Sequence, residues 1–232
     1  MAKILYEGKS KVILEGRDDK SALVYYKDTA TAFDGKKKED LNGKGKLNAA
    51  ISHLIYGRLE ENGIETHLLE VVDDTSALVK KAEIVMVEVI VRNVAAGSFS
   101  KKYGVPEGTE LKNTTIEFSL KDDTLGDPQI NESQVTALGI ATADELNQMK
   151  VQALRINEIL SKIFDNVGIR LVDYKLEFGR YEDRLILCDE ISPDSCRFWD
   201  KETNKKLDKD RFRRDMGNVL DGYQDVLERL QV

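Results

Sequence analysis

Charged and large apolar side chains alternate in the segment Leu171–Gly179, whose sequence is LVDYKLEFG. Successive side chains of a strand point to opposite faces, so Asp173, Lys175 and Glu177 are expected to share one face, spaced by roughly 7 Å. The residues expected on the opposite, core-facing side are Val172, Tyr174, Leu176 and Phe178. A solvated strand face with mixed charges is the most common explanation of such alternation.

The next apolar segment, LILCDE, disfavours the solvated face, because it is too apolar for either of its own faces to be fully exposed. We therefore expect the two segments to form a hairpin beside a cleft. If paired residues keep the same parity, Asp189 lies opposite Lys175 and diagonal to Glu177. Leu185 and Leu187 would then lie on the cleft face, where one of them would form the floor of an adenine pocket.

Glu177 and Asp189 are the candidate metal ligands. Mg²⁺ accepts one or two carboxylates and completes its octahedron with phosphate oxygens and water. This residue pair therefore predicts a site for Mg²⁺ bound together with a nucleotide.

A second alternating strand, VEVIVR, ends at Arg92 and runs into the small residues of NVAAGS, which end at Ser98. Arg92 offers a planar cation with several donors, and the small residues let backbone N–H groups and a hydroxyl approach an anion closely. The pattern predicts a phosphate or carboxylate site. For an isolated match, however, an exposed arginine before a turn is the ordinary explanation.

A glycine-containing turn near the start of the chain, Tyr6–Lys11 (YEGKSK), joins two β-like segments. It is not a Walker loop, because it lacks the G-x-x-x-x-G-K-[ST] spacing. Taken alone, this segment is more simply interpreted as an ordinary hairpin than as a phosphate-binding flap.

These residues must be positioned by a frame of strands and helices. We expect strands at 4–7, 11–14, 22–26, 67–72, 77–79, 84–92, 169–178 and 184–189. A helix over 47–59 should end at Gly63, and the clearest helix starts at the capping box of Thr142 and Glu145 and ends at Gly168. A last helix is expected over 209–230, whereas 27–45 and the segment up to about residue 140 read as polar or loop-rich. Strands and helices mixed without βαβ alternation favour an α+β fold.

Composition restricts the function. The chain has 232 residues, of which 41% are hydrophobic and 33% charged, and no segment resembles a membrane span or a signal peptide. We therefore expect a cytoplasmic protein with no membrane partner. The net charge of −7 argues against nucleic acid as a partner. Two cysteines without C-x-x-C spacing and two histidines disfavour a disulfide framework, a zinc site and a histidine-based triad.

The segments around Arg92–Ser98 and Asp173–Gly179 resemble the two signatures of the phosphoribosylaminoimidazole-succinocarboxamide synthase (SAICAR synthetase) family. The resemblance extends over nearly the whole chain and includes YEGKSK, TAFDG, INES, DEISPDSCRFWD and DKDRFR. Tyr174 stands where Phe is common in the family and Met86 stands where Pro is expected. Neither departure falls on a proposed catalytic group.

This resemblance implies a two-lobed α+β enzyme with largely antiparallel sheets, flanking helices and a nucleotide site similar to those of protein kinases and ATP-grasp ligases. Residues 1–83 would form an N-terminal lobe whose sheet covers ATP, and residues 84–232 would carry the substrate and metal site. The implied cofactors are ATP and Mg²⁺, and the implied oligomer is a homodimer.

The resemblance also implies roles for individual residues. Those implied for ATP and Mg²⁺ are Lys11 and Lys121 at the phosphates, Glu83–Met86 beside adenine, and Glu177 with Asp189 at the metal. Those implied for the imidazole ribonucleotide are Asp34, Arg92, Ser98, Lys175 and Arg197, with Arg213 a weaker candidate. Asp34, Arg92 and Lys175 are the candidates for catalysis, and Lys9 lies near the site without an assigned role.

The expected reaction is the ATP-dependent ligation of L-aspartate to 5-amino-1-(5-phospho-D-ribosyl)imidazole-4-carboxylate in purine biosynthesis. A carboxylate is a poor electrophile towards an amine, so we expect an acyl phosphate to form from Mg-ATP before the amine attacks; the reverse order also fits the sequence. A small-molecule kinase would use the same metal pair but release a stable phosphorylated product. A nucleic-acid-binding module is a third alternative, which the net charge disfavours.

Overall fold

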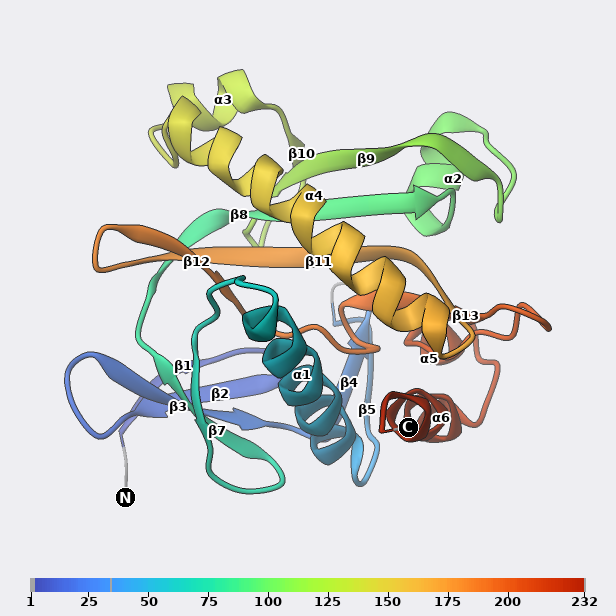
Figure 1. Ribbon diagram of the computed structural model, residues 1–232, viewed down its shortest axis with the longest axis horizontal. Helices are drawn as coiled ribbons and strands as arrows, with labels where there is room; N and C mark the ends of the chain where they lie inside the picture. The colour runs from blue at the N-terminus through green and yellow to red at the C-terminus, as the bar shows by residue number, and fades with distance from the viewer. Residues whose placement is uncertain (1–2, 34, 232) are drawn as a thin grey trace.

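The computed structural model describes residues 3–33 and 35–231, which form an α+β fold built on antiparallel sheets (Figure 1). The fold class expected from the sequence is confirmed. Within this part of the chain the strands are β1 (Ile4–Glu7), β2 (Lys11–Glu15), β3 (Ser21–Tyr26), β4 (Thr29–Ala32), β5 (Lys37–Asp40), β6 (Leu68–Val71), β7 (Ser76–Lys80), β8 (Glu83–Val94), β9 (Glu110–Leu120), β10 (Gln129–Ile130), β11 (Ile169–Tyr181), β12 (Arg184–Cys188) and β13 (Cys196–Asp200). The helices are α1 (Lys44–Glu61), α2 (Gly97–Tyr103), α3 (Glu132–Ala137), α4 (Ala143–Asn166), α5 (Asp210–Arg213) and α6 (Val219–Leu230).

The first sheet has the strand order β1-β2-β3-β7-β6, and all of its pairs are antiparallel. Its strands come from the first 80 residues. Helix α1 lies beside α6, from the far end of the sequence (Figure 1). Apolar residues of α1 also belong to the large core of the second sheet. The first sheet therefore ends before Glu83, the first residue of β8, while α1 packs against residues of the second sheet.

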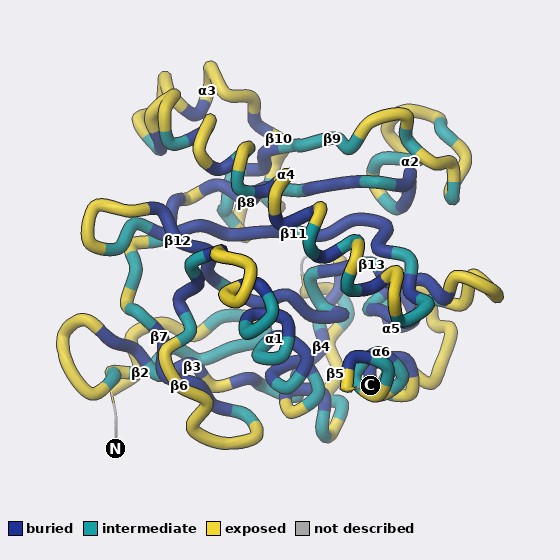
Figure 2. Tube along the Cα trace, in the orientation of Figure 1, coloured by how far each residue is buried: buried dark blue, intermediate teal, exposed yellow. Residues whose placement is uncertain are grey.

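The second sheet has the order β10-β9-β8-β11-β12, and β13 pairs with the first half of β11. Strands β8 and β11 are buried along most of their length (Figure 2). Helix α4 covers one face of this sheet, where its apolar stripe meets Val89 of β8 and Leu176 of β11. The predicted capping box forms at Thr142 and Glu145. The opposite face, free of α4, is available for polar groups.

Three expectations about secondary structure are wrong. The segment 27–45 contains the hairpin β4–β5, and the segment up to residue 140 contains the long strand β9. The last helix is two helices, α5 and α6, because Gly217 and Asn218 adopt left-handed backbone conformations between them. Within the described residues, no helix is long and apolar enough to cross a membrane.

Candidate active site

The polar face of the second sheet forms the floor of the site. Antiparallel pairing places Glu177 of β11 beside Glu88 of β8, and Asp173 beside Arg92. Because strand side chains alternate, Lys175 lies between these two pairs on the same face. The three charged residues of LVDYKLEFG thus face away from the core, while Tyr174, Leu176 and Phe178 are buried against it, as the alternation predicted. Val172 was expected on the same side but is buried in a separate cluster with Trp199, because the pairing of β11 with β13 is irregular between Leu171 and Asp173.

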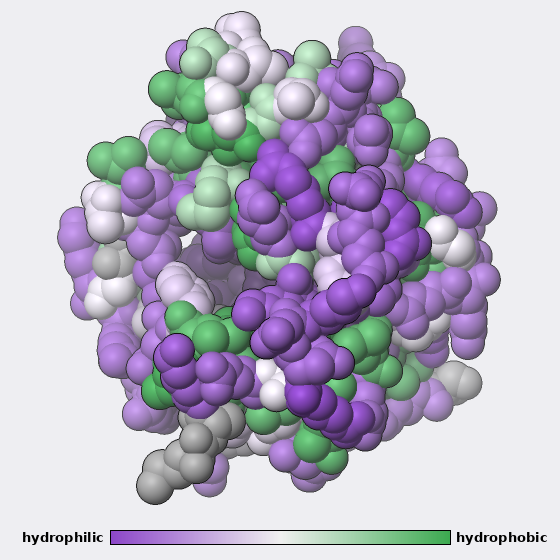
Figure 3. Space-filling view, turned by 90° about the vertical axis from the view of Figure 1, so that its left-hand side faces the viewer, coloured by the Kyte–Doolittle hydropathy of each residue, from purple (hydrophilic) through white to green (hydrophobic). Residues whose placement is uncertain are grey.

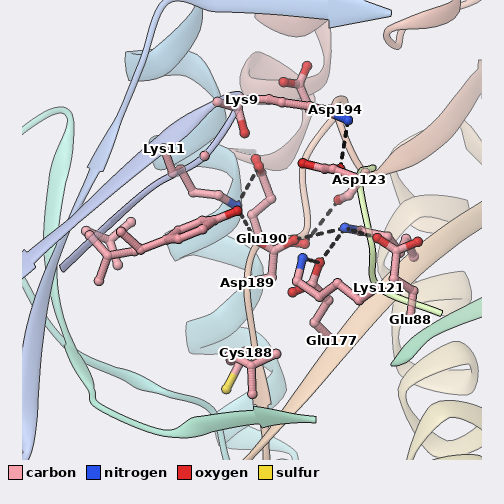
Figure 4. Close-up of a pocket in the computed structure, with 18 of the residues that line it drawn as sticks. Lys9, Lys11, Glu88, Lys121, Asp123, Glu177, Cys188, Asp189, Glu190 and Asp194 are labelled. Atoms are coloured by element: carbon pink, nitrogen blue, oxygen red, sulfur yellow. Dashed lines mark hydrogen bonds and ion pairs between the residues drawn. The ribbon is translucent and has the colours of Figure 1, made fainter. Parts of the chain in front are cut away.

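Lysines and carboxylates alternate at one end of this floor (Figure 4). The Nζ atom of Lys175 donates to Glu177 and lies 2.9 Å from Oε1 of Glu88 and 3.5 Å from Oδ2 of Asp189. Lys121 Nζ donates to Oε1 of Glu177 at 2.8 Å, and Lys11 of β2 donates to Asp189. Two lysines from outside β11 therefore donate hydrogen bonds to Glu177 and Asp189, the two carboxylates predicted to bind metal.

The charges of this cluster stabilise one another. Burial lowers the pKa of Lys11, but the carboxylates of Asp189 and Glu190 outweigh this effect and hold the pKa above its ordinary value. Burial likewise raises the pKa of Asp189, but the ammonium groups of Lys11, Lys175 and Lys121 outweigh it and hold the pKa below the usual range. The lysines are therefore protonated and Asp189 is ionised at neutral pH.

The predicted hairpin register is wrong by one residue. Glu177 pairs with Cys188, and Phe178 pairs with Leu187, so Leu185 and Leu187 pack in the core and do not form a pocket floor. Asp189 still reaches the site because its backbone is left-handed, with φ of 66°. This conformation ends β12 and turns the carboxylate towards Lys11.

A cavity of about 500 Å³ opens above this cluster, between the two sheets. The face shown in Figure 3 is hollowed, with hydrophilic and hydrophobic residues both present along the rim. Apolar side chains line one part of the cavity and charged ones another. The apolar lining residues are Ile13, Ala22, Val24, Ala32, Phe33, Val79, Ala82 and Ile84.

Glycine is required at position 179, where the chain passes close to the next segment. A Cβ atom there would lie 2.7 Å from the Cβ of Ala82 and 3.0 Å from the sulfur of Cys188. The glycine that ends LVDYKLEFG thus lets β11 approach the cavity wall.

An arginine cluster lies at the other end of the floor. Arg92 donates to Oδ2 of Asp173 at 2.7 Å, to Glu117 of β9 at 2.8 Å and to the hydroxyl of Ser98 at 3.2 Å. Arg197 of β13 donates to both oxygens of Asp173 at 3.0 Å. One buried carboxylate therefore joins Arg92 and Arg197, two residues that the resemblance implies for the substrate.

Of the other predicted residues, only some line the cavity, and Arg92, Ser98 and Arg197 are not among its lining residues. Lys9 lines it and donates to Asp123 at 2.7 Å, and Arg213 lines it from α5. Met86 is not among the lining residues and is 48% exposed, with its carbonyl accepting from the backbone of Lys121 at 3.1 Å. Asp34 lies outside the described residues.

Sequence reasoning missed several lining residues. Glu190 accepts from Lys11 at 2.8 Å, and Asp194 contacts the fully buried Lys44 at 2.8 Å. Lys209 also lines the cavity, 3.8 Å from Asp194. The segment DEISPDSCRFWD and the motif DKDRFR contain three of these residues, so unusually dense charge within apolar sequence was the available signal.

Comparison with known proteins decides the family. The family model described as SAICAR synthetase matches residues 4–230. A phosphoribosylaminoimidazole-succinocarboxamide synthase of Clostridium perfringens (strain SM101 / Type A) is 53% identical over 98% of this chain and 97% of its own length. The chain belongs to the SAICAR synthetase family.

Solved structures of this family agree with the fold. The phosphoribosylaminoimidazole-succinocarboxamide synthase of Ehrlichia chaffeensis has a TM-score of 0.97 at 44% identity, covering 99% of this chain and 98% of its own. A SAICAR synthetase (Type-2) in complex with ADP has a TM-score of 0.94 at 45% identity, covering 97% of this chain and 96% of its own. Membership confirms the expected family and class of activity, ATP-dependent ligation in purine biosynthesis.

Proposed function

We propose that the cavity joins L-aspartate to 5-amino-1-(5-phospho-D-ribosyl)imidazole-4-carboxylate, with ATP converted to ADP and phosphate. The observation that carries this proposal is a single sheet face with a lysine–carboxylate cluster at one end and an arginine cluster at the other. The lysine–carboxylate cluster suits phosphoryl transfer from ATP, and the arginine cluster suits the binding of an anionic substrate. A relative at 45% identity is in complex with ADP, which supports placing a nucleotide here.

We assign ATP to the end of the cavity between the two sheets. Lys11 and Lys121 would contact its phosphates, and the apolar residues around Val79 and Ala82 would contact adenine. The segment Glu83–Met86 was expected to lie beside adenine. Because Met86 is not among the lining residues and Ala82 and Ile84 are, we move this assignment a few residues towards Ala82.

Two carboxylates fit the expected Mg²⁺. Glu177 and Asp189 contact the same ammonium group, that of Lys175, so they lie close enough to share one small cation. Among the described residues, no group of three or more His, Cys, Asp and Glu could hold a metal by itself. Phosphate oxygens and water would therefore complete the coordination, as Mg²⁺ prefers. When bound, the ion would offset the negative charge of the phosphate oxygens.

The ribonucleotide would lie between the two clusters. Arg92, Ser98 and Arg197 would hold its phosphate end, and Lys175 would hold its carboxylate where it can meet the γ-phosphoryl group. Asp34 and Arg213 remain proposed contacts to the same substrate. Holding both substrates in this way makes the reaction between them effectively unimolecular, with the carboxylate in line with the γ-phosphoryl group.

The chemistry proceeds through an activated carboxylate. A carboxylate oxygen attacks the γ-phosphorus, the bond from this phosphorus to the bridging oxygen breaks, and ADP leaves. The amine of aspartate then attacks the acyl carbon, loses a proton, and expels phosphate. Lys121 and Lys175 would stabilise the charge that develops on the transferred group. The same residues also suit the reverse order, in which the amine adds first.

Three broader assignments accompany this function. We propose that residues 1–83 and 84–232 act as two lobes around ATP, because the sheets separate at that point. We also propose a homodimer in the cytoplasm, which rests on the resemblance of the sequence to the family.

An assay of ADP release, with each component omitted in turn, tests the proposal. We expect ADP only when ATP, Mg²⁺, the ribonucleotide and L-aspartate are all present. Steady ADP release without the ribonucleotide would refute the proposal. A stable phosphorylated product formed without aspartate would favour a kinase.

A further inference from the structure

A buried carboxylate in α5 contacts three arginines, of which Arg214 lies 3.3 Å from its Oδ2 and also donates to Glu107. Asp210 is 1% exposed, and each of its oxygens accepts from a different guanidinium group. Oδ2 accepts from Nε of Arg197 at 2.9 Å, and Oδ1 accepts from Nη1 of Arg213 at 2.6 Å. Arg197 comes from β13 and Arg213 lines the cavity, so Asp210 links the arginine cluster to the cavity wall.

The link leaves donors available on both arginines. Arg197 uses Nη1 for Asp173, and its Nη2 makes no hydrogen bond to any described residue. Nη2 instead lies against Gly97, where an added Cβ atom would clash with it. Likewise, Nε and Nη2 of Arg213 have no partner in the described part of the chain. Free N–H groups on two fixed guanidinium planes form a site suited to an oxyanion.

A second carboxylate fixes Asp210 itself. Asp208 is fully buried, and its two oxygens accept backbone N–H groups from Asp210 at 2.7 Å and from Phe198 at 2.9 Å. Phe198 follows Arg197 in β13, so Asp208 fastens the four-residue α5 to the strand that carries the arginine. These two hydrogen bonds thereby restrict the movement of Asp210 relative to Arg197.

Two guanidinium groups also repel each other unless a negative charge lies between them. The carboxylate of Asp210 supplies this charge, and Asp173 supplies it between Arg197 and Arg92. The result is a chain of alternating charges that runs from β8 to α5. Without Asp210, Arg197 and Arg213 would move apart. An anion would then have to bring them together on binding, which would lower its affinity.

We propose that Asp210 is a positioning residue, which holds Arg197 and Arg213 in place to bind the 5′-phosphate of the ribonucleotide. The proposal rests on the ligase function proposed above. The reacting carboxylate of the substrate must meet the γ-phosphoryl group of ATP at the lysine cluster. The phosphate, on the other side of the ribose, therefore lies towards the arginines. Asp210 acts through these arginines and does not itself contact the substrate.

The test compares Asp210→Asn with wild-type enzyme and with the control Asp225→Asn. Asparagine keeps the size of the side chain but removes the charge that holds Arg197 and Arg213 and that also lies beside Arg214. Asp225 makes a similar two-bond contact to Arg229 on α6, and neither residue lines the cavity. KM and kcat are measured for the ribonucleotide, ATP and L-aspartate, together with ADP affinity and the melting temperature.

We expect the KM for the ribonucleotide to rise about tenfold or more in Asp210→Asn, as for the loss of a charge-assisted hydrogen bond. The KM for ATP and the affinity for ADP should change by less than about twofold, and Asp225→Asn should match wild type in all three KM values. A parallel rise for ribonucleotide and ATP would overturn the proposal and assign Asp210 a purely structural role. So would an unchanged ribonucleotide KM in a folded variant. If the wild-type enzyme forms no amide product, this result refutes the proposed ligase function and is thereby distinguished from a failure of the role proposed for Asp210.

A second measurement identifies the anion. The nucleoside that lacks the 5′-phosphate is tested as a competitive inhibitor of wild type and Asp210→Asn. We expect the variant to bind the nucleoside as wild type does, because the affected contact is absent. If the variant weakens the nucleoside as much as the ribonucleotide, Asp210 acts on another part of the substrate, and the phosphate assignment is wrong.

Discussion

The variant Glu177→Gln separates the contribution of this carboxylate to turnover from its contribution to the stability of the fold. Glu177 is 4% exposed, and its Oε1 accepts from Lys121 and Lys175. A charge-assisted hydrogen bond contributes about 1.5–3 kcal/mol and a neutral one about 0.5–1.5 kcal/mol, so two weakened bonds amount to roughly 2–3 kcal/mol. The lysine side chains are 31% and 28% exposed, and Lys175 keeps Glu88 as a partner, so we expect a loss of about 1–2 kcal/mol.

Such a loss lowers the melting temperature of a protein of this size by roughly 2–8 °C, which leaves it folded at 25 °C. Turnover should fall much further. The substituted amide would offer Mg²⁺ a neutral oxygen in place of a charged one, and a deficit of at least about 1.5–3 kcal/mol corresponds to roughly 10–100-fold. High Mg²⁺ should restore part of the activity.

The assay measures ADP release against Mg²⁺ concentration for wild type and Glu177→Gln, with melts followed by circular dichroism. Glu145→Gln is the matched control, since Glu145 accepts from Nε of Arg180 at 2.5 Å outside the cavity. It should lower the melting temperature without changing the dependence on Mg²⁺. Wild-type turnover of a folded Glu177→Gln variant at limiting Mg²⁺ would remove Glu177 from the metal site.

Three further predictions concern other charged residues. Asp189→Asn should also lose turnover and be partly rescued by Mg²⁺ in the ADP assay; Asn tolerates the left-handed backbone, so a melting temperature lowered without Mg²⁺ dependence would count against a metal role. Arg92→Lys keeps a positive charge beside Asp173 but loses the planar guanidinium group, so the KM for the ribonucleotide should rise about tenfold while the KM for ATP stays constant. If both KM values change by the same factor, the role of Arg92 is structural. The side chain of Arg180 lowers the pKa of Glu145 to about 2, so this pair stabilises the fold above pH 4.5 and loses its effect as the pH falls towards 2. Urea denaturation should accordingly show the stability gap between wild type and Glu145→Gln closing over that range, and a constant gap would contradict the assignment.

Alternation in the sequence predicted the two faces of β11 correctly, because a strand that is buried on one side and polar on the other has a period of two. The pairing of β11 with β12 was not predictable in the same way. The hairpin turns through Glu182 and Asp183, both with positive φ, and this two-residue turn fixes Tyr181 opposite Arg184. No glycine or asparagine marks the turn, so the sequence did not reveal the register.

The missed elements have physical reasons of their own. Strand β9 presents Thr115, Glu117 and Ser119 beside Arg92, Ile90 and Glu88 of β8, so its cleft-facing side is polar and its hydrophobic signal is weak. Strand β4 packs only small residues, such as Ala30, against Phe212.

The arginine cluster could be predicted only in part. Its members come from β8, β11, β13 and α5, and the contact of Asp173 with both Arg92 and Arg197 depends on three strands pairing side by side. The resemblance of the sequence to the family indicated the arginines. The carboxylates that join them required the structure.

The most direct test of the account follows the substrate's carboxylate oxygen. Ribonucleotide labelled with ¹⁸O in its carboxylate is converted with ATP, Mg²⁺ and L-aspartate, and the released phosphate is analysed by mass spectrometry. If ATP activates the carboxylate for ligation, one labelled oxygen leaves with the phosphate, whichever step comes first. Phosphate without the label, released alongside the amide product, would show that ATP hydrolysis is not coupled through this carboxylate and would contradict the proposed function.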